Sequence, residues 1–218
     1  MPYAIGAGAR RRIVLASTSR YRRMLLERLR ISFVAVAPGT DETPLPGESP
    51  AATAWRLAEA KARSVAIAHP DALIIGSDQV ADCGGRAIGK PGNHERAVAQ
   101  LEGLSGKTVV FHTGLALLDA ASGQCQTALV DVRSTFRFLT AAEIDAYLRQ
   151  ERPYDCAGSV RSEALGIALF ESIESDDPTA LIGLPLIRLT GMLRAAGFPV
   201  LQALPATNPH SDSSATGP

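Results

Sequence analysis

The stretch RIVLASTSRYRRMLLERL, residues 12–29, decides the fold because its hydrophobic pattern changes within a few residues. Residues 12–17 form a short apolar run, which predicts a buried β-strand. The apolar side chains that follow recur at helical spacing, at Met24, Leu25, Leu26 and Leu29. Ser19 stands where a serine can cap the helix. The segment therefore predicts a strand that runs directly into a helix.

Strands and helices continue to alternate beyond this unit. Further strands are predicted over residues 31–36, 73–77, 107–118, 124–138 and 167–173. Further helices are predicted over residues 49–68, 93–104, 140–150 and 186–196. Turns at Gly84-Gly85 and near Ser122-Gly123 predict two hairpins. This alternation, with long antiparallel strands in the middle, predicts an α/β fold with a mixed sheet.

The length of 218 residues fits one sizeable domain, which can be divided into two lobes. Residues 1–10 are expected to be loose, residues 11–202 to form the domain, and residues 203–218 to be a disordered tail. The tail is rich in Pro, Ser and Thr and offers almost nothing to bury.

Charge and cysteine content exclude several classes of protein. Basic and acidic residues balance at 22 each, which argues against a nucleic-acid coat or a membrane-surface binder. The three cysteines are widely spaced, as expected for a reducing compartment rather than a disulfide framework. No apolar run is long enough to span a bilayer, and the start lacks the order of a signal peptide. We therefore expect a cytoplasmic protein.

The junction between the first strand and the first helix is a candidate phosphate site. A helix N-terminus presents free N–H groups and the positive end of the helix dipole. Ser17 adds a hydroxyl group, and Arg22 adds a guanidinium group that can bind phosphate oxygens in a bidentate way. Taken alone the pattern is weak, because serine caps followed by arginines are common on solvated helices.

Two carboxylates and two lysines complete a candidate reaction centre. Glu42 lies in a proline-rich loop, and Asp78 closes the apolar strand predicted over residues 73–77. Both are oxygen ligands suited to Mg²⁺, and Asp78 can also activate water. Lys61 and Lys90 can stabilise the departing pyrophosphate of a triphosphate. Each lysine considered singly is more typical of a solvated surface charge.

Taken in order, these motifs resemble the Maf family of nucleotide pyrophosphatases. The resemblance covers residues 12–200 and is carried by LASTSRYRR, DETP, LAEAKA, IIGSDQV, GKP and CAGSVRSEALG. It implies the elongated, two-lobed α/β fold of inosine-triphosphate pyrophosphatases, with a cleft between the lobes and hydrolysis dependent on a divalent metal, Mg²⁺ or Mn²⁺. It also implies that Asp78 is catalytic, that Ser17, Arg22, Lys61 and Lys90 handle phosphate, and that Glu42 and Asp78 hold the metal.

Three positions resemble the branch of the family that acts on 7-methyl-GTP. These are Tyr21, Gln79 and Glu163. Methylated guanine is cationic, so an aromatic ring can stack on it and a carboxylate can balance its charge. The resemblance would place proline at position 20 and tryptophan at position 21, where this chain has Arg20 and Tyr21. Without the resemblance, Tyr21 is a helix-surface aromatic and Glu163 a loop charge.

Two other functions remain open from the sequence. A pyrophosphatase of the same family acting on dTTP and UTP differs at the same three specificity positions. A non-catalytic regulator of cell division belongs to another class, against which the complete set of acidic and basic groups argues. The resemblance further implies a homodimer, with a nucleotide as substrate and neither nucleic acid nor membrane as a partner.

Overall fold

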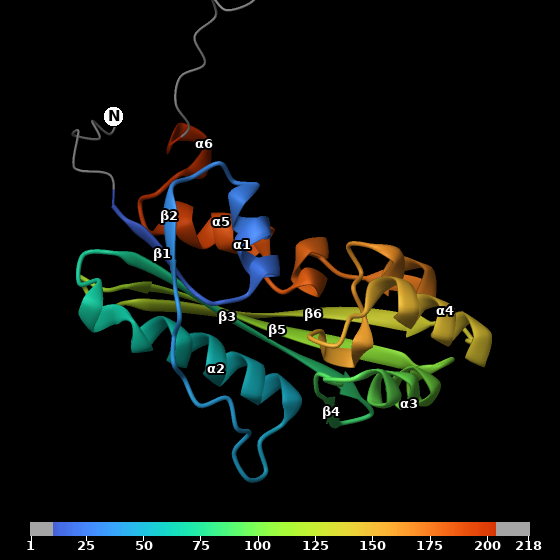
Figure 1. Ribbon diagram of the computed structural model, residues 1–218. Coiled ribbons are helices and arrows are strands. Elements are labelled where there is room, and N and C mark those ends of the chain that lie inside the picture. Colours follow the sequence, from blue (N-terminus) through green and yellow to red (C-terminus); the bar gives the residue numbers. More distant parts are fainter. Residues whose placement is uncertain (1–10, 204–218) are drawn as a thin grey trace, which may run out of the picture.

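The computed structural model describes residues 11–203 and has a seven-stranded mixed sheet at its centre (Figure 1). The strand order is β2-β1-β3-β5-β6-β7, and β4 pairs with β3. The first strand is parallel to both its neighbours, and the other pairings are antiparallel. The strands are β1 (Ile13–Ala16), β2 (Phe33–Val36), β3 (Leu73–Cys83), β4 (Arg86–Ile88), β5 (Thr108–Asp119), β6 (Cys125–Phe136) and β7 (Phe170–Glu174).

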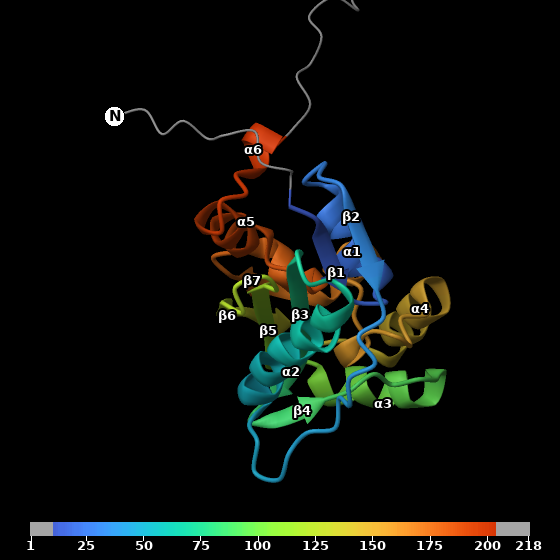
Figure 2. The same cartoon turned by 90° about the vertical axis from the view of Figure 1, so that its left-hand side faces the viewer.

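Helices cover both faces of this sheet (Figures 1 and 2). The α-helices are α1 (Arg20–Glu27), α2 (Pro50–Ser64), α3 (His94–Leu104), α4 (Ala141–Glu151), α5 (Leu186–Ala195) and α6 (Val200–Ala203). Four 3-10 helices connect them: η1 (Ala66–Ala68), η2 (Ala157–Ser159), η3 (Leu165–Leu169) and η4 (Pro178–Ile182). Near β1, α1 and α5 cover one face and α2 covers the other, whereas α3 and α4 lie toward the far end of the long strands.

The hydrophobic core is divided in a way that defines two lobes. In the first lobe, one cluster packs β1, α1 and α5 together, and another lies beneath α2. A third cluster joins α3 and α4 to the distal halves of the long strands. Because β3 and β5 contribute to clusters in both lobes, the sheet is continuous between them. The predicted mixed α/β fold with two lobes is therefore confirmed.

Side-chain caps begin helices at Ser19, as predicted, and also at Asn93 and Thr140. The hydroxyl of Ser19 accepts the N–H of Arg22, and the side chain of Asn93 accepts the N–H of Arg96. Thr140 begins α4 with a complete capping box. Such caps satisfy amide groups that have no partner inside the helix.

Two strand predictions were wrong in extent. Asp78 does not close its strand, because β3 continues to Cys83 and pairs with β5 from Leu73 to Asp82. The polar side chains of Asp78 and Gln79 resemble a strand end in the sequence, yet they lie in the middle of an extended strand. The strand predicted over residues 167–173 begins only at Phe170, after η3. There the amide of Gly166 turns back to the carbonyl of Arg161 at 3.1 Å.

The two glycines of the long strands allow α2 to lie directly on the sheet. A Cβ atom added at Gly76 would lie 2.1 Å from the carbonyl oxygen of Ala58, and one at Gly114 would lie 2.1 Å from that of Ala54. Real Cβ atoms do not approach backbone oxygens so closely. This contact fixes α2, and with it Lys61, at its short distance from β3.

A gap at the edge of β3 separates the two lobes. Residues 73–75 pair with β1, and residues 81–83 pair with β4. Among the residues that the structure describes, 76–80 have no strand partner on this side. The chain that leaves β1 enters α1 at this gap, and the chain that leaves β4 reaches Lys90. The fold thus brings distant segments to one open sheet edge.

The ends of the chain were predicted only in part. Ala203, which the expected tail included, is the last residue of α6. The loose segment 1–10 and the remainder of the tail lie outside the described residues. None of the helices between residues 11 and 203 combines the length and the apolar character that crossing a bilayer requires.

Candidate active site

A buried lysine between two carboxylates lies at the gap. The Nζ atom of Lys61 lies 2.5 Å from Oε1 of Glu42 and 2.6 Å from Oδ1 of Asp78. Only 4% of the Lys61 side chain is exposed, and 11% of that of Asp78, whereas Glu42 is open to solvent. We call these residues the Lys61 cluster. Since the ammonium group contacts both carboxylates, it holds them side by side and offsets their repulsion.

Electrostatic coupling extends from this cluster to other predicted cations. Burial alone would raise the pKa of Glu42, but the hydrogen bond from Lys61 and the charges of Lys61, Lys90 and Arg22 lower it below its usual value. Burial lowers the pKa of the Arg22 guanidinium, against the opposing effect of Asp78 and Glu42. The predicted acidic and basic groups therefore act on one another across a single site.

Backbone contacts fix the orientation of Arg22. Its Nε atom donates to the carbonyl of Gly183 at 2.8 Å, and the same carbonyl accepts the hydroxyl of Ser77 at 2.9 Å. Gly183 adopts a φ of 116°, in the left-handed region that favours glycine. Within the described chain the terminal nitrogens of Arg22 have no hydrogen-bonding partner, so both are available to an anionic ligand.

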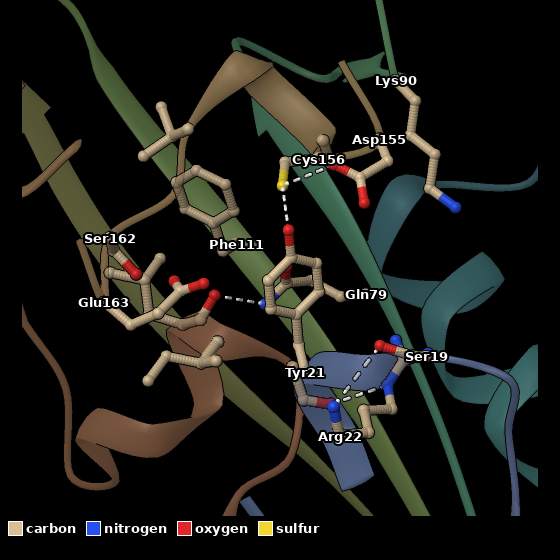
Figure 3. Close-up of a pocket in the computed structure, with 15 residues that line it drawn as sticks. Ser19, Tyr21, Arg22, Gln79, Lys90, Phe111, Asp155, Cys156, Ser162 and Glu163 are labelled. Atoms are coloured by element: carbon tan, nitrogen blue, oxygen red, sulfur yellow. Dashed lines mark hydrogen bonds between the residues drawn. The ribbon is translucent and has the colours of Figure 1, made fainter. Parts of the chain in front are cut away.

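The three predicted specificity residues line one pocket beside the Lys61 cluster (Figure 3). Tyr21, Gln79 and Glu163 come from α1, β3 and the segment after η2, and they surround the same hollow together with Arg22 and Lys90. We call this the Tyr21 pocket. A second cleft, lined by Glu42 and Asp78, adjoins it and shares Gln79 and Lys90. We call it the Asp78 cleft.

Neighbouring residues of β3 serve the two hollows because successive side chains of a strand point to opposite faces. Asp78 lies on the face covered by α2, where it meets Lys61. Gln79 lies on the other face and contacts η4. Both faces are accessible from the gap in the sheet edge, which explains how one strand can contribute to both.

The side-chain amide of Gln79 is held in place by hydrogen bonds within the fold. Its amide nitrogen donates to the carbonyls of Ala180 and Leu181 and to the hydroxyl of Thr113, at 2.7, 3.1 and 3.0 Å. These three acceptors determine which side of the amide is nitrogen. The amide donor of Gln79 is thus occupied within the fold, and the side-chain oxygen is the group left for a ligand.

The ring of Tyr21 lies close to two arginines. The guanidinium carbon of Arg20 is 4.7 Å from the ring centroid, and that of Arg161 is 5.8 Å away. The hydroxyl accepts a hydrogen bond from Arg20 at 2.6 Å, and the thiol of Cys156 lies 3.6 Å from it. Burial raises the pKa of this hydroxyl. A cationic base on this ring needs nearby negative charge, which Asp155 and Glu163 supply in the pocket lining.

The two serines that precede α1 have different surroundings, and Ser19 caps the helix as predicted. Ser17 is buried, and its Oγ atom accepts the N–H of Ser19 at 3.1 Å. Ser19 caps α1 and lines the Tyr21 pocket, whereas Ser17 is absent from the described pocket linings. Ser17 therefore shapes the turn into α1, and the phosphate contact predicted for it stays a prediction, while Ser19 is the serine that lines the pocket.

Several pocket residues were missed by sequence reasoning. Asp155, Cys156 and Ser162 line the Tyr21 pocket, in irregular chain that no periodicity marks. Cys156 and Ser162 lie in the motif CAGSVRSEALG but were assigned no role, and Asp155 comes directly before it. Cys156 is the residue of these three that carries a thiol. Burial raises the pKa of its thiol to about 11, so the reactive thiolate is scarce near neutral pH.

The carboxylates of the Lys61 cluster fit a magnesium-type ion bound together with a substrate. Among residues 11–203, no three His, Cys, Asp or Glu side chains gather into a metal cage. Mg²⁺ is commonly held by only one or two carboxylates, with waters and substrate phosphates as the other ligands. Glu42 and Asp78 each use one oxygen for Lys61 and keep the other, so their donor set suits this mode.

Comparisons with known proteins agree with the geometry. The family model described as Maf-like protein matches residues 12–196. The 7-methyl-GTP pyrophosphatase of Burkholderia thailandensis is 62% identical over 195 residues, covering 88% of this chain and 91% of that protein. The 7-methyl-GTP pyrophosphatase of Cupriavidus pinatubonensis is 59% identical over 192 residues, covering 88% and 96%. The chain belongs to the Maf family.

Proposed function

We propose that this protein hydrolyses 7-methyl-GTP to 7-methyl-GMP and pyrophosphate in the cytoplasm, and so removes a modified nucleotide from the pool. The observation that carries the proposal is the single site at the edge of β3, where Glu42 and Asp78 interact with Arg22, Lys61 and Lys90. The names of the relatives support the choice of substrate.

The residues divide the reaction between them. Asp78 takes a proton from the water that attacks the α phosphorus, and Lys61 keeps its carboxylate in place. Arg22 and Lys90 offset the negative charge that develops on the departing pyrophosphate. Glu42 and Asp78 hold a divalent cation, Mg²⁺ or Mn²⁺, which when bound neutralises charge on the phosphate chain.

Base recognition takes place in the Tyr21 pocket. Tyr21 stacks on the methylated ring, and Glu163 accepts hydrogen bonds from the guanine N1–H and 2-amino group while balancing the ring's charge. Gln79 contributes its side-chain oxygen, because its amide nitrogen is held by η4. Ser19, at the start of α1, faces the phosphate chain together with the free helix amides.

A nucleotide panel tests the proposed function. Pyrophosphate release is measured for 7-methyl-GTP, GTP, dTTP and UTP, each with Mg²⁺ or Mn²⁺. We expect 7-methyl-GTP to have the highest kcat/KM and GTP to be turned over more slowly. A preference for dTTP and UTP would assign the chain to the other substrate class of the family. No turnover of any nucleotide would favour the non-catalytic regulator.

A further inference from the structure

An outer groove between β4 and α3 carries strong positive charge. Of the residues between 11 and 203, four cations and no carboxylate line it, and the cations are Arg86, Lys90, Arg96 and Lys107. Its other lining residues include the apolar side chains of Ile88, Pro91 and Leu104. Cationic and apolar side chains together suit a ligand that has both phosphates and a flat apolar part, which describes a nucleotide.

The charge of this groove is not compensated within the described chain. Arg86, Arg96 and Lys107 are exposed, and none of them has an ion pair with any residue between 11 and 203. Other arginines of this electrically neutral protein, such as Arg56 and Arg63, do have carboxylate partners. An uncompensated cluster of cations raises the local concentration of anions.

The outer groove adjoins the site described above. Lys90 lines the groove, the Tyr21 pocket and the Asp78 cleft, and Ile88 lines both the groove and the Asp78 cleft. A ligand whose phosphate chain passes Lys90 can therefore extend from the Tyr21 pocket into the groove. A triphosphate that ends at its γ-phosphate leaves the groove empty, whereas one joined to a second nucleoside can fill it.

We propose that the enzyme also accepts dinucleoside polyphosphates, an inference that rests on the proposed function. The Tyr21 pocket holds the methylated base, and the outer groove holds the second nucleoside. Water attacks the α phosphorus next to 7-methylguanosine, and the bond from that phosphorus to the bridging oxygen breaks. For a triphosphate bridge, the products are 7-methyl-GMP and the diphosphate of the second nucleoside, and two protons are released when both new phosphate ends are fully ionised. The second nucleoside diphosphate leaves in the place of pyrophosphate.

The test compares two substrates with the complete protein and Mg²⁺: 7-methyl-GTP, and the dinucleoside triphosphate of 7-methylguanosine and guanosine. We expect the second to yield 7-methyl-GMP and GDP by chromatography. The Arg86→Ala/Arg96→Ala variant loses two exposed charge contacts in the outer groove, so its KM for the dinucleotide should rise about three- to tenfold. Its KM for 7-methyl-GTP, which does not enter the groove, should stay within about twofold of the parent value. Arg194→Ala, an exposed arginine of α5, is the control and should change neither.

Three results would overturn the inference while leaving the proposed function intact. These are hydrolysis of 7-methyl-GTP alone, an equal rise of KM for both substrates in the double variant, and release of GMP with 7-methyl-GDP. Failure to hydrolyse either substrate would instead overturn the proposed function, and the inference with it.

Discussion

At the scale of single residues, the site depends on charges that are few and close together. Lys61 is the centre of this arrangement, since both carboxylates share its ammonium group at hydrogen-bonding distance. Removal of one partner from such a buried group leaves an uncompensated charge, which costs more than the pair contributes. The residues of the Lys61 cluster are therefore expected to act as one unit.

Glu163 is the residue on which selectivity for the methylated base is expected to depend. Glu163→Gln keeps the size of the side chain but removes its negative charge from the Tyr21 pocket. We expect the preference for 7-methyl-GTP over GTP to fall about tenfold, the effect of roughly 1.4 kcal/mol, while hydrolysis of GTP continues. Steady-state kinetics with both nucleotides measure the ratio.

The control for this variant is Glu171→Gln, which changes an exposed glutamate of β7 away from the pocket. It should leave both rates unchanged. If Glu163→Gln keeps the preference of the parent protein, Glu163 has no part in recognising the base.

At the scale of elements, the contact between α2 and the sheet places Lys61 beside Asp78. Gly114→Ala would put a methyl group where the backbone of Ala54 now lies. We expect α2 to be displaced, the free energy of unfolding to fall by about 1–3 kcal/mol, and activity to fall with it. Urea denaturation followed by circular dichroism measures the first effect.

Gly103→Ala is the matched control, because a Cβ atom there meets nothing within 4 Å and the residue lies in α3. It should leave stability unchanged or raise it slightly, as alanine favours helices. An equal loss of stability in both variants would mean that the close contact between α2 and Gly114 is not the cause of the fall in the free energy of unfolding.

The loop that carries Glu42 is fastened to α2 by Glu48. Both of its oxygens contact Arg56, at 2.6 and 2.7 Å, and it also accepts the N–H of Leu45 and the hydroxyl of Thr53. The hydrogen bonds from Arg56 are the main reason that the pKa of Glu48 falls from 4.5 to about 2. Glu48→Gln should therefore destabilise the loop and lower activity.

The pH dependence of this effect has a definite sign. The folded-state pKa is lowered, so the stabilisation by Glu48 is complete above its unfolded pKa of about 4.5 and is lost as the pH falls toward about 2. The difference in urea midpoint between parent and Glu48→Gln should accordingly be constant near neutral pH and shrink below pH 4.5. A difference that grows as the pH falls would contradict this account of the loop.

The sequence predicts the starts of the helices better than it predicts the arrangement of the site. Caps at Ser19, Asn93 and Thr140 were predictable because they depend on local hydrogen bonds. The gap beside β3 was not, because it depends on where β1 and β4 stop pairing, which is a property of the assembled sheet. For the same reason Asp78 was placed at a strand end, and the occupied donor of Gln79 went unseen.

At the scale of the whole molecule, one sheet carries two lobes and the site lies where its edge is open. The family resemblance implies a homodimer, and we expect light scattering of the purified protein to give twice the mass of 22.9 kDa. A mass that stays at one chain over a wide range of concentrations would contradict the dimer without affecting the site, since every residue assigned to it comes from one chain.

The central claim is that Asp78 works with its cationic neighbours in one hydrolytic site. Its most direct test is pyrophosphate release from 7-methyl-GTP by Asp78→Asn, a substitution that preserves shape and removes the basic group. We predict that kcat falls about 10²- to 10⁴-fold, the usual contribution of a general base, while thermal unfolding confirms that the variant is folded. An Asp78→Asn protein that hydrolyses 7-methyl-GTP as fast as its parent would contradict the account.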